Sequence, residues 1–288
     1  MITQNELLNI CHKLAFPEEA CEYFSQAYSG LLKADGCYEK LMKAEDAMIN
    51  CGGDFEKVVP FLDSASEMCG LTRRTLDMIF RIITIPDVVK LYEAKEVPEN
   101  IIWDTLADIT YELKECHRVF GEWGTFVLWF YPRLFAVNLF RLGRLEFELH
   151  DNDDLIDCHI SSYGRLDMEA VMESLKEAYR FFGYEASGKQ MKITCDSWLL
   201  YPPMKDIYPK DSNLKKFFDL FEIVESKETN EDMWYIFWKP VDTPVDELPE
   251  ETSLQRGAKA WLMSGKSLGI GIGRFDFDGE NVRRAAFD

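Results

Sequence analysis

Apolar residues recur at helical spacing through the first part of the chain, up to about residue 120. Thr3 and Glu6 form a capping box before the first apolar stripe, and glycines and prolines separate the segments that follow. Pro86 and Pro98 are each expected to start a helix, because proline fits the first helical turn but not the helix interior. The pattern predicts a helical N-terminal domain over residues 1–121.

After Gly121 and Gly124 the pattern changes, first to a short apolar helix kinked near Pro132 and then to period-two alternation. The alternation predicts strands at residues 144–149, 155–160, 191–200, 221–226, 233–239 and 268–277. Helices are predicted from the N-caps Asp167, Ser212 and Thr252. The first two strands form a hairpin across the polar turn 150–154, and the fourth pairs with the fifth. Residues 122–288 are therefore expected to form an α/β domain.

The strand Met191–Leu200 ends in polar residues and then in two prolines, Pro202 and Pro203, which prevent it from continuing. Asp196, Ser197 and Trp198 bring a carboxylate, a hydroxyl and an indole to this end of the strand. Because ligands of α/β folds bind at the carboxyl ends of strands, we expect the site here.

The last predicted strand carries Gly269, Gly271 and Gly273 at every second position. Since alternate residues share a face, the three glycines leave a bare backbone stripe on one side of the strand. A bulky neighbour is expected to cover this stripe in preference to a ligand. The candidates are Trp234, Trp238 and Trp261.

The formal charge of −19, from 32 basic and 51 acidic residues, argues against nucleic acid as a partner. The eight cysteines show no CxxC spacing, and adjacent Cys-His pairs rarely supply two metal ligands, so buried thiols and no metal are expected. No signal-like N-terminus and no run of 18 apolar residues occur, which predicts a cytoplasmic protein without a membrane partner.

Several segments of the second half together resemble a bacterial family of acyltransferase-domain proteins. They are GRLEFE (143–148), CHI (158–160), DSWLL (196–200), DSNL (211–214) and LPEETSLQR (248–256). The resemblance covers residues 98–275, and the first helices by composition. It implies an α+β fold, with an all-helical N-acyltransferase-type domain followed by a GNAT-like mixed, mainly antiparallel sheet flanked by helices. The order of elements read from the pattern fits this fold.

The resemblance also implies a chemistry and its residues. In GNAT enzymes acyl-CoA lies along the strand before a phosphate-binding turn, and 191–200 is the equivalent candidate here. Acyl-CoA is therefore expected as co-substrate. The expected cofactor contacts are Trp198, Leu199 and Leu200, with Ser212 and Asn213 as an anion site that ordinary N-capping explains equally well. Asp196 or His159 is the expected general base.

The sequence is compatible with two functions. The first is an N-acyltransferase that moves an acyl group from acyl-CoA to an unidentified small-molecule amine. The second is a non-catalytic GNAT-like module that binds or senses a metabolite or protein partner. The second function is favoured by the turn after Leu200. Tyr201-Pro202-Pro203 replaces the usual glycine turn, and proline has no N–H to donate to a phosphate. A third hypothesis is a helical interaction protein in which residues 1–120 bind a partner.

Overall fold

The computed structural model describes residues 1–52, 54–150, 155–162 and 164–283. Contacts within the chain divide it into two units, Met1–Phe140 and Arg141–Asp288. The domain boundary expected after Gly121 stays a prediction. Truncated chains, rather than contacts within the structure, would test where the N-terminal domain ends. Within the described residues, no helix combines the length and the apolar character needed to cross a membrane.

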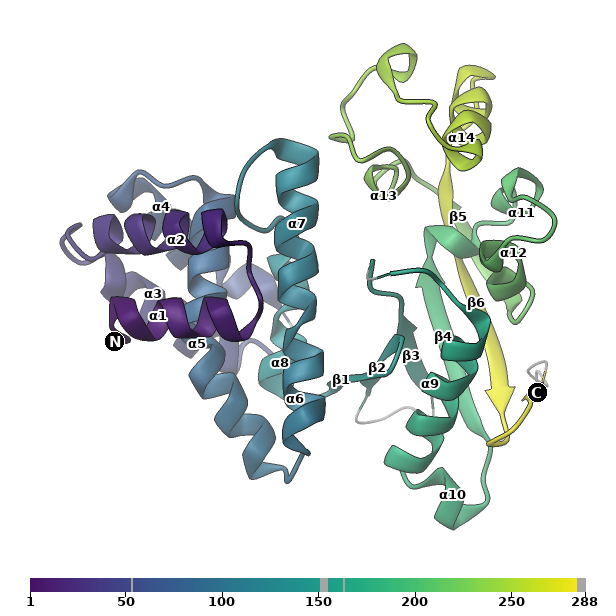
Figure 1. Cartoon of the computed structure of the whole chain (residues 1–288), viewed down its shortest axis with the longest axis horizontal. Coiled ribbons are helices and arrows are strands. Elements are labelled where there is room, and N and C mark those ends of the chain that lie inside the picture. Colours follow the sequence, from purple (N-terminus) through teal and green to yellow (C-terminus); the bar gives the residue numbers. More distant parts are fainter. Residues whose placement is uncertain (53, 151–154, 163, 284–288) are drawn as a thin grey trace. The chain divides into compact units, whose positions relative to one another are not determined.

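The first unit is built around the helix α5 (Arg73–Ala94), which packs against α1, α2, α4, α6 and α8 (Figure 1). The other helices of this unit are α1 (Gln4–Lys13), α2 (Glu18–Leu31), α3 (Cys37–Asn50), η1 (Phe55–Lys57), α4 (Val59–Cys69), α6 (Glu99–Leu106), α7 (Asp108–Phe120), η2 (Leu128–Phe130) and α8 (Pro132–Ala136). The capping box of Thr3 and Glu6 is present at α1, as the sequence predicts.

Pro86 does not start a helix, contrary to the sequence-based prediction, but lies inside α5. A proline in a helix interior removes one backbone hydrogen bond and costs about 3 kcal/mol. Residues on every side of the preceding turns, such as Ile79, Phe80, Ile82 and Ile83, are buried. Their burial, at about 1.5–3 kcal/mol for each large side chain, outweighs the cost of the proline.

A buried ion pair joins α5 to α7 in this unit. Arg81 is only 1% exposed, and its guanidinium pairs with the carboxylate of Glu112. The hydroxyl of Thr125 donates to the same carboxylate at 3.1 Å, and Arg81 donates to the carbonyl of Val127 at 3.1 Å. Burial raises the pKa of Glu112 to about 7, against the lowering effect of Arg81. These contacts hold the segment after α7 against α5.

The second unit contains most of a sheet with seven described strands in the order β1-β2-β3-β4-β6-β5, with β7 paired to β6. The strands are β1 (Leu139–Leu142), β2 (Leu145–Leu149), β3 (Leu155–His159), β4 (Met191–Ser197), β5 (Glu222–Glu228), β6 (Gly269–Phe277) and β7 (Val282–Arg283). The neighbours β3 and β4 are parallel, whereas β2/β3, β4/β6, β5/β6 and β6/β7 are antiparallel. The predicted α+β class with a mixed, mainly antiparallel sheet is confirmed.

The helices of this unit flank the sheet (Figure 1). They are α9 (Met168–Phe181), α10 (Tyr184–Ser187), η3 (Trp198–Leu200), α11 (Met204–Ile207), α12 (Asn213–Phe218), α13 (Trp234–Phe237), η4 (Val245–Glu247) and α14 (Ser253–Met263). Asp167 caps α9 as predicted, and Tyr179 of α9 packs edge-on against Phe277 of β6, with ring centroids 5.8 Å apart. One sheet face therefore forms the core with α9.

The predicted hairpin of the first two strands is confirmed as β2 and β3, with Glu146 opposite His159 and Phe147 opposite Cys158. Its turn residues 151–154 lie outside the described residues. All eight cysteines are free thiols, and seven are buried, as expected. Burial raises the pKa of Cys158 and Cys195, so both thiols stay protonated and inert.

The predicted strand 233–239 is wrong, because these residues form the helix α13 and β5 pairs with β6 instead. In α13 the side chains of Trp234, Ile236 and Phe237 are all buried. In a strand, Ile236 and Phe237 would point to opposite faces of the sheet. A single helical turn can bury both of them together with Trp234.

The glycine stripe of β6 is covered by chain that follows β4, not by the expected tryptophans. A Cβ at Gly271 would lie 2.1 Å from the carbonyl oxygen of Leu200, and one at Gly269 would lie 2.5 Å from the ring of Tyr201. At Gly273 the nearest atoms belong to Phe221 and Leu200. The glycines therefore let η3 and Tyr201 turn closely over β6 at the end of β4.

Candidate active site

The parallel strands β3 and β4 pair over only part of their length. The register joins Leu155–Asp157 to Lys192–Thr194, and no further pair follows within the described residues. His159 and Asp196 each lie two positions beyond the last pair, so both side chains leave the same face of the sheet. Their place, at the carboxyl ends of neighbouring parallel strands, is where α/β folds bind ligands. The structure thus brings the two predicted catalytic residues together.

The carboxyl group of Asp196 is exposed and makes no hydrogen bond to any residue that the structure describes. Partial burial raises its pKa, and the neighbouring carboxylates of Asp157 and Glu225 raise it further. His159 and Lys227 lower the pKa by a smaller total effect. Asp196 is therefore more basic than an ordinary aspartate, as a general base requires.

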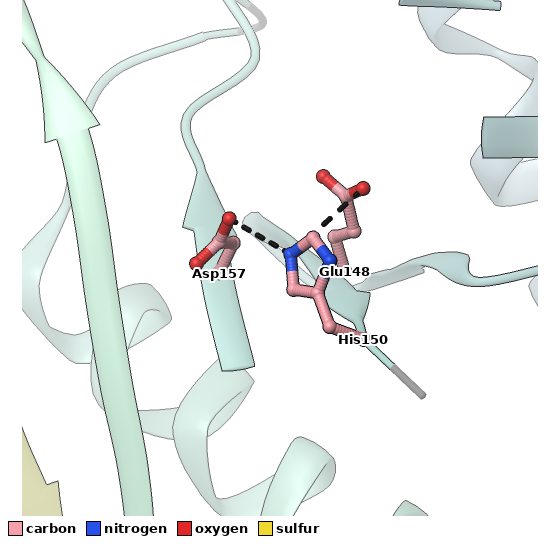
Figure 2. Close-up of side chains that lie close together, drawn as sticks. All are labelled: Glu148, His150 and Asp157. Atoms are coloured by element: carbon pink, nitrogen blue, oxygen red, sulfur yellow. Dashed lines mark hydrogen bonds and ion pairs between the residues drawn. The ribbon is translucent and has the colours of Figure 1, made fainter. Parts of the chain in front are cut away.

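Carboxylates hold both imidazoles of the β2–β3 hairpin. The Nε2 of His159 lies 3.0 Å from Oε2 of Glu148. The Nε2 of His150 lies 3.0 Å from Oδ2 of Asp157 and 4.0 Å from Oε1 of Glu148 (Figure 2). A carboxylate partner fixes the orientation of an imidazole ring.

The same cluster offers a candidate set of metal ligands. One ligand atom each from Glu148, His150 and Asp157 lies within 4.8 Å of the others, and Figure 2 shows the imidazole between the two carboxylates. Imidazole and carboxylate together suit a first-row divalent ion such as Zn²⁺. The hydrogen bonds among these side chains explain the arrangement equally well.

Sequence reasoning missed Glu148 and Asp157 as members of the site. The signal was present, since Glu146 and Glu148 alternate with buried residues on β2, and Asp157 and His159 alternate on β3. Only the register of the hairpin, with Glu148 opposite Asp157, shows that these four polar residues share one face.

Of the three predicted cofactor contacts at the end of β4, only Trp198 borders open space. Leu199 is already engaged, because its N–H donates to Oγ of Ser197 at 3.2 Å and its carbonyl accepts from Tyr208 at 3.0 Å. Leu200 is fully buried against β6. Contact of Trp198, Leu199 and Leu200 with a cofactor stays a prediction.

Ser212 and Asn213 stand at the start of α12, where Oγ of Ser212 accepts from the N–H of Lys215 at 3.2 Å. This is an ordinary N-cap on a helix of six residues. No hydrogen bond in the described part of the chain joins these two residues to Asp196 or His159. The anion site predicted there stays a prediction.

A depression lies beside Trp198 that is too narrow to enclose a water molecule. Its lining consists of Trp198, Met204, Thr229, Asp232, Met233, Ile236, Leu268 and Gly269. Burial raises the pKa of Asp232 to about 6, and the charge of Asp196 adds to the increase. No sequence pattern indicates this depression, because residues 227–232 have the composition of a polar connection between two strands.

Comparison with protein-family models matches both halves of the chain. Residues 5–136 match the N-acyltransferase N-terminal domain, and residues 139–275 match the GNAT-like C-terminal domain. The chain belongs to this acyltransferase family. A search of curated proteins found no significant match to the acyltransferase.

Solved structures share the fold of this acyltransferase. One is an acyltransferase in complex with decanoyl-CoA and teicoplanin, with 22% identity, a TM-score of 0.74, and coverage of 92% of this chain and 86% of that one. Another is an acyltransferase mutant in complex with octanoyl-CoA, with 21% identity, a TM-score of 0.76, and coverage of 94% and 87%. The predicted family and enzyme class are confirmed.

Proposed function

We propose that this acyltransferase transfers an acyl group from acyl-CoA to the amine of a small molecule, at the carboxyl ends of β3 and β4. The observation that carries the proposal is the meeting of Asp196 with the His159–Glu148 pair where the two parallel strands stop pairing. The solved acyltransferases of the same fold were crystallised with decanoyl-CoA, octanoyl-CoA or teicoplanin, which supports acyl-CoA as the donor here.

The surrounding charges suit an amine that arrives protonated. The carboxylates of Asp157, Glu225 and Asp232 all interact with the charge of Asp196. A cationic ammonium is attracted to this group, whereas a carboxylate substrate is repelled. The acceptor is therefore an amine, consistent with the chemistry of the family.

The reaction then needs one proton transfer before attack. Asp196 takes a proton from the ammonium, directly or through a water, and leaves the neutral amine. The amine nitrogen attacks the thioester carbonyl carbon and becomes positively charged. As the C–S bond breaks, this nitrogen loses its second proton, which passes to the leaving thiolate of CoA directly or through a water. The products are an amide and free CoA. His159, whose imidazole lies 3.0 Å from the carboxylate of Glu148, is the other candidate for this base.

In this proposal Trp198 borders the acyl-CoA, while Leu199 and Leu200 shape the turn that carries it. Ser212 and Asn213 remain the proposed contacts for a phosphate of CoA, through N–H groups at the start of α12. The test is isothermal titration of the protein with acetyl-CoA, octanoyl-CoA and CoA. Heat of binding with micromolar affinity is expected, and no heat at millimolar ligand would refute acyl-CoA as the donor.

The second candidate, a binding or sensing module without catalysis, rests on two observations. The turn after β4 contains Pro202 and Pro203, which have no N–H to donate. The N-terminus of α9 is also occupied, because the carboxylate of Asp167 accepts from the N–H groups of Glu169 and Ala170. Release of free CoA in the presence of an amine, lost in Asp196→Asn, would exclude this alternative.

A further inference from the structure

Four free cysteines of the helical unit stand as two pairs. Cys11 of α1 lies beside Cys21 of α2, and Cys37 of α3 lies beside Cys69 of α4, with a hydrogen bond between the thiols of each pair. Cys11, Cys21 and Cys37 are fully buried, whereas Cys69 is the one cysteine of the described chain that is not buried. The pairs therefore differ in whether a reagent in the solvent can reach a thiol.

Backbone contacts place Cys37 against the last turn of α4. The Sγ of Cys37 donates to the carbonyl oxygen of Ala65 at 3.4 Å. Ala65 lies one helical turn before Cys69, so the two side chains share a face of α4. At the neighbouring position of α3, a Cβ added to Gly36 would lie 3.2 Å from Cε of Met68. The start of α3 and the end of α4 therefore meet at the two thiols.

Both thiols stand at a helix end beside a glycine. Cys37 is the first residue of α3 and follows Gly36, whose φ is 73°, and Cys69 is the last residue of α4 and precedes Gly70, whose φ is 71°. A disulfide needs its two sulfur atoms at about 2.05 Å. Because helix ends move more easily than helix interiors, the sulfur atoms can approach one another without disturbing the packing of either helix.

We propose that Cys37 and Cys69 form an oxidation-sensitive pair, which a peroxide converts into a disulfide that joins α3 to α4. The thiolate of Cys69 attacks one oxygen of hydrogen peroxide, the O–O bond breaks, and a sulfenic acid and one water result. The sulfur of Cys37 then attacks the sulfenic sulfur, and its proton passes to the departing hydroxide as the second water. The two thiols lose two electrons, and the peroxide gains them.

The order of the two steps follows from burial. Burial raises the pKa of Cys37 to about 12, and a protonated thiol is a poor nucleophile, so Cys69 reacts with the peroxide first. Burial also raises the pKa of both Cys11 and Cys21, and neither thiol is exposed. The Cys11–Cys21 pair therefore serves as an internal control that stays reduced.

The test treats the full chain with a small molar excess of hydrogen peroxide. The remaining thiols are then alkylated in denaturant, and the peptides are mapped by mass spectrometry. Two of the eight thiols should be lost, in a peptide that links Cys37 to Cys69, at least about ten-fold faster than Cys11 and Cys21 react. The absence of this peptide would overturn the proposal, as would an equally fast link between Cys11 and Cys21 or a disulfide between two chains.

Variants separate the two steps. Cys69→Ser should lose no thiol to peroxide, and Cys37→Ser should lose only the thiol of Cys69, which dimedone captures as the sulfenic acid. Cys51→Ser removes another buried cysteine of the same unit and should lose two thiols, as the native chain does. A loss of two thiols in Cys69→Ser would overturn the proposal. The peptide map of the native chain decides it even if a substitution unfolds the protein.

Discussion

Two carboxylates of the helical unit and two of the sheet unit stand in opposite settings. In the helical unit, Glu112 pairs with Arg81, and Asp77 pairs with Arg73 at 2.8 Å. In the sheet unit, Asp196 and Asp232 stand beside further carboxylates, with no ion pair to a described residue. The Arg81–Glu112 pair joins α5 to α7, whereas the Arg73–Asp77 pair lies within α5. The pKa values of Asp196 and Asp232 are raised by burial first and by neighbouring carboxylates second, which marks this part of the sheet unit as the candidate site.

The largest expected effect comes from breaking a paired charge. Arg81→Met leaves the carboxylate of Glu112 buried without its partner, and the free energy of unfolding should fall by about 3–5 kcal/mol. Urea denaturation of the full chain measures the loss. Lys43→Met, an exposed change of the same kind in the same unit, should be almost neutral. The double variant Arg81→Met/Glu112→Leu should recover much of the stability, and a loss as large as in the single variant would argue against the pairing.

Two glycines, one in each unit, give the next contrast. Gly271→Ala places a Cβ 2.1 Å from the carbonyl oxygen of Leu200 and should destabilise the fold by about 1–3 kcal/mol. Gly30→Ala, in α2 with nothing within 4 Å, should stabilise it by about 0.5–1 kcal/mol. Thermal unfolding of the two variants measures both signs. If Gly271→Ala were as stable as the native chain, η3 would not pass close over β6.

The unpaired carboxylate of Asp232 predicts a pH effect of similar or smaller size. Its pKa is about 6 in the folded chain and 3.8 as the ordinary value, so the folded state binds more protons between these values. The contribution of Asp232 to stability is therefore favourable at low pH and is lost as pH rises from about 4 to 6. Relative to the native chain, Asp232→Asn should gain about 1–3 kcal/mol across this window. Denaturant titrations at both pH values test it, and a constant difference would contradict the raised pKa.

Local signals in the sequence predict some elements of the fold correctly and others wrongly. Caps and periodicity are local signals, so Thr3, Asp167 and the hairpin of β2 and β3 follow from the sequence alone. Pro86 is misleading because the burial of distant residues against α5 overrides a local preference. The error at α13 has a similar origin, since bulky apolar residues suit a strand or a short buried helix equally well.

Some residues of the candidate site can also be found from the sequence, and others cannot. Asp196 and His159 can be found from the sequence, because each ends a patterned strand. Asp157, Glu148 and Asp232 cannot, since their closeness depends on strand register and on a connection that folds back beside Trp198. Electrostatic neighbours come from tertiary structure, and no local pattern encodes them.

The most direct test of the proposed chemistry is the rate of CoA release from octanoyl-CoA with benzylamine as acceptor, compared among the native chain, Asp196→Asn and the control Asp242→Asn, which makes the same charge change at an exposed position. We expect Asp196→Asn to lower kcat by about 10²–10⁴-fold at neutral pH, with little change in the KM for octanoyl-CoA, while the control keeps the native rate. A native-like kcat in Asp196→Asn would contradict the assignment of Asp196 as the base.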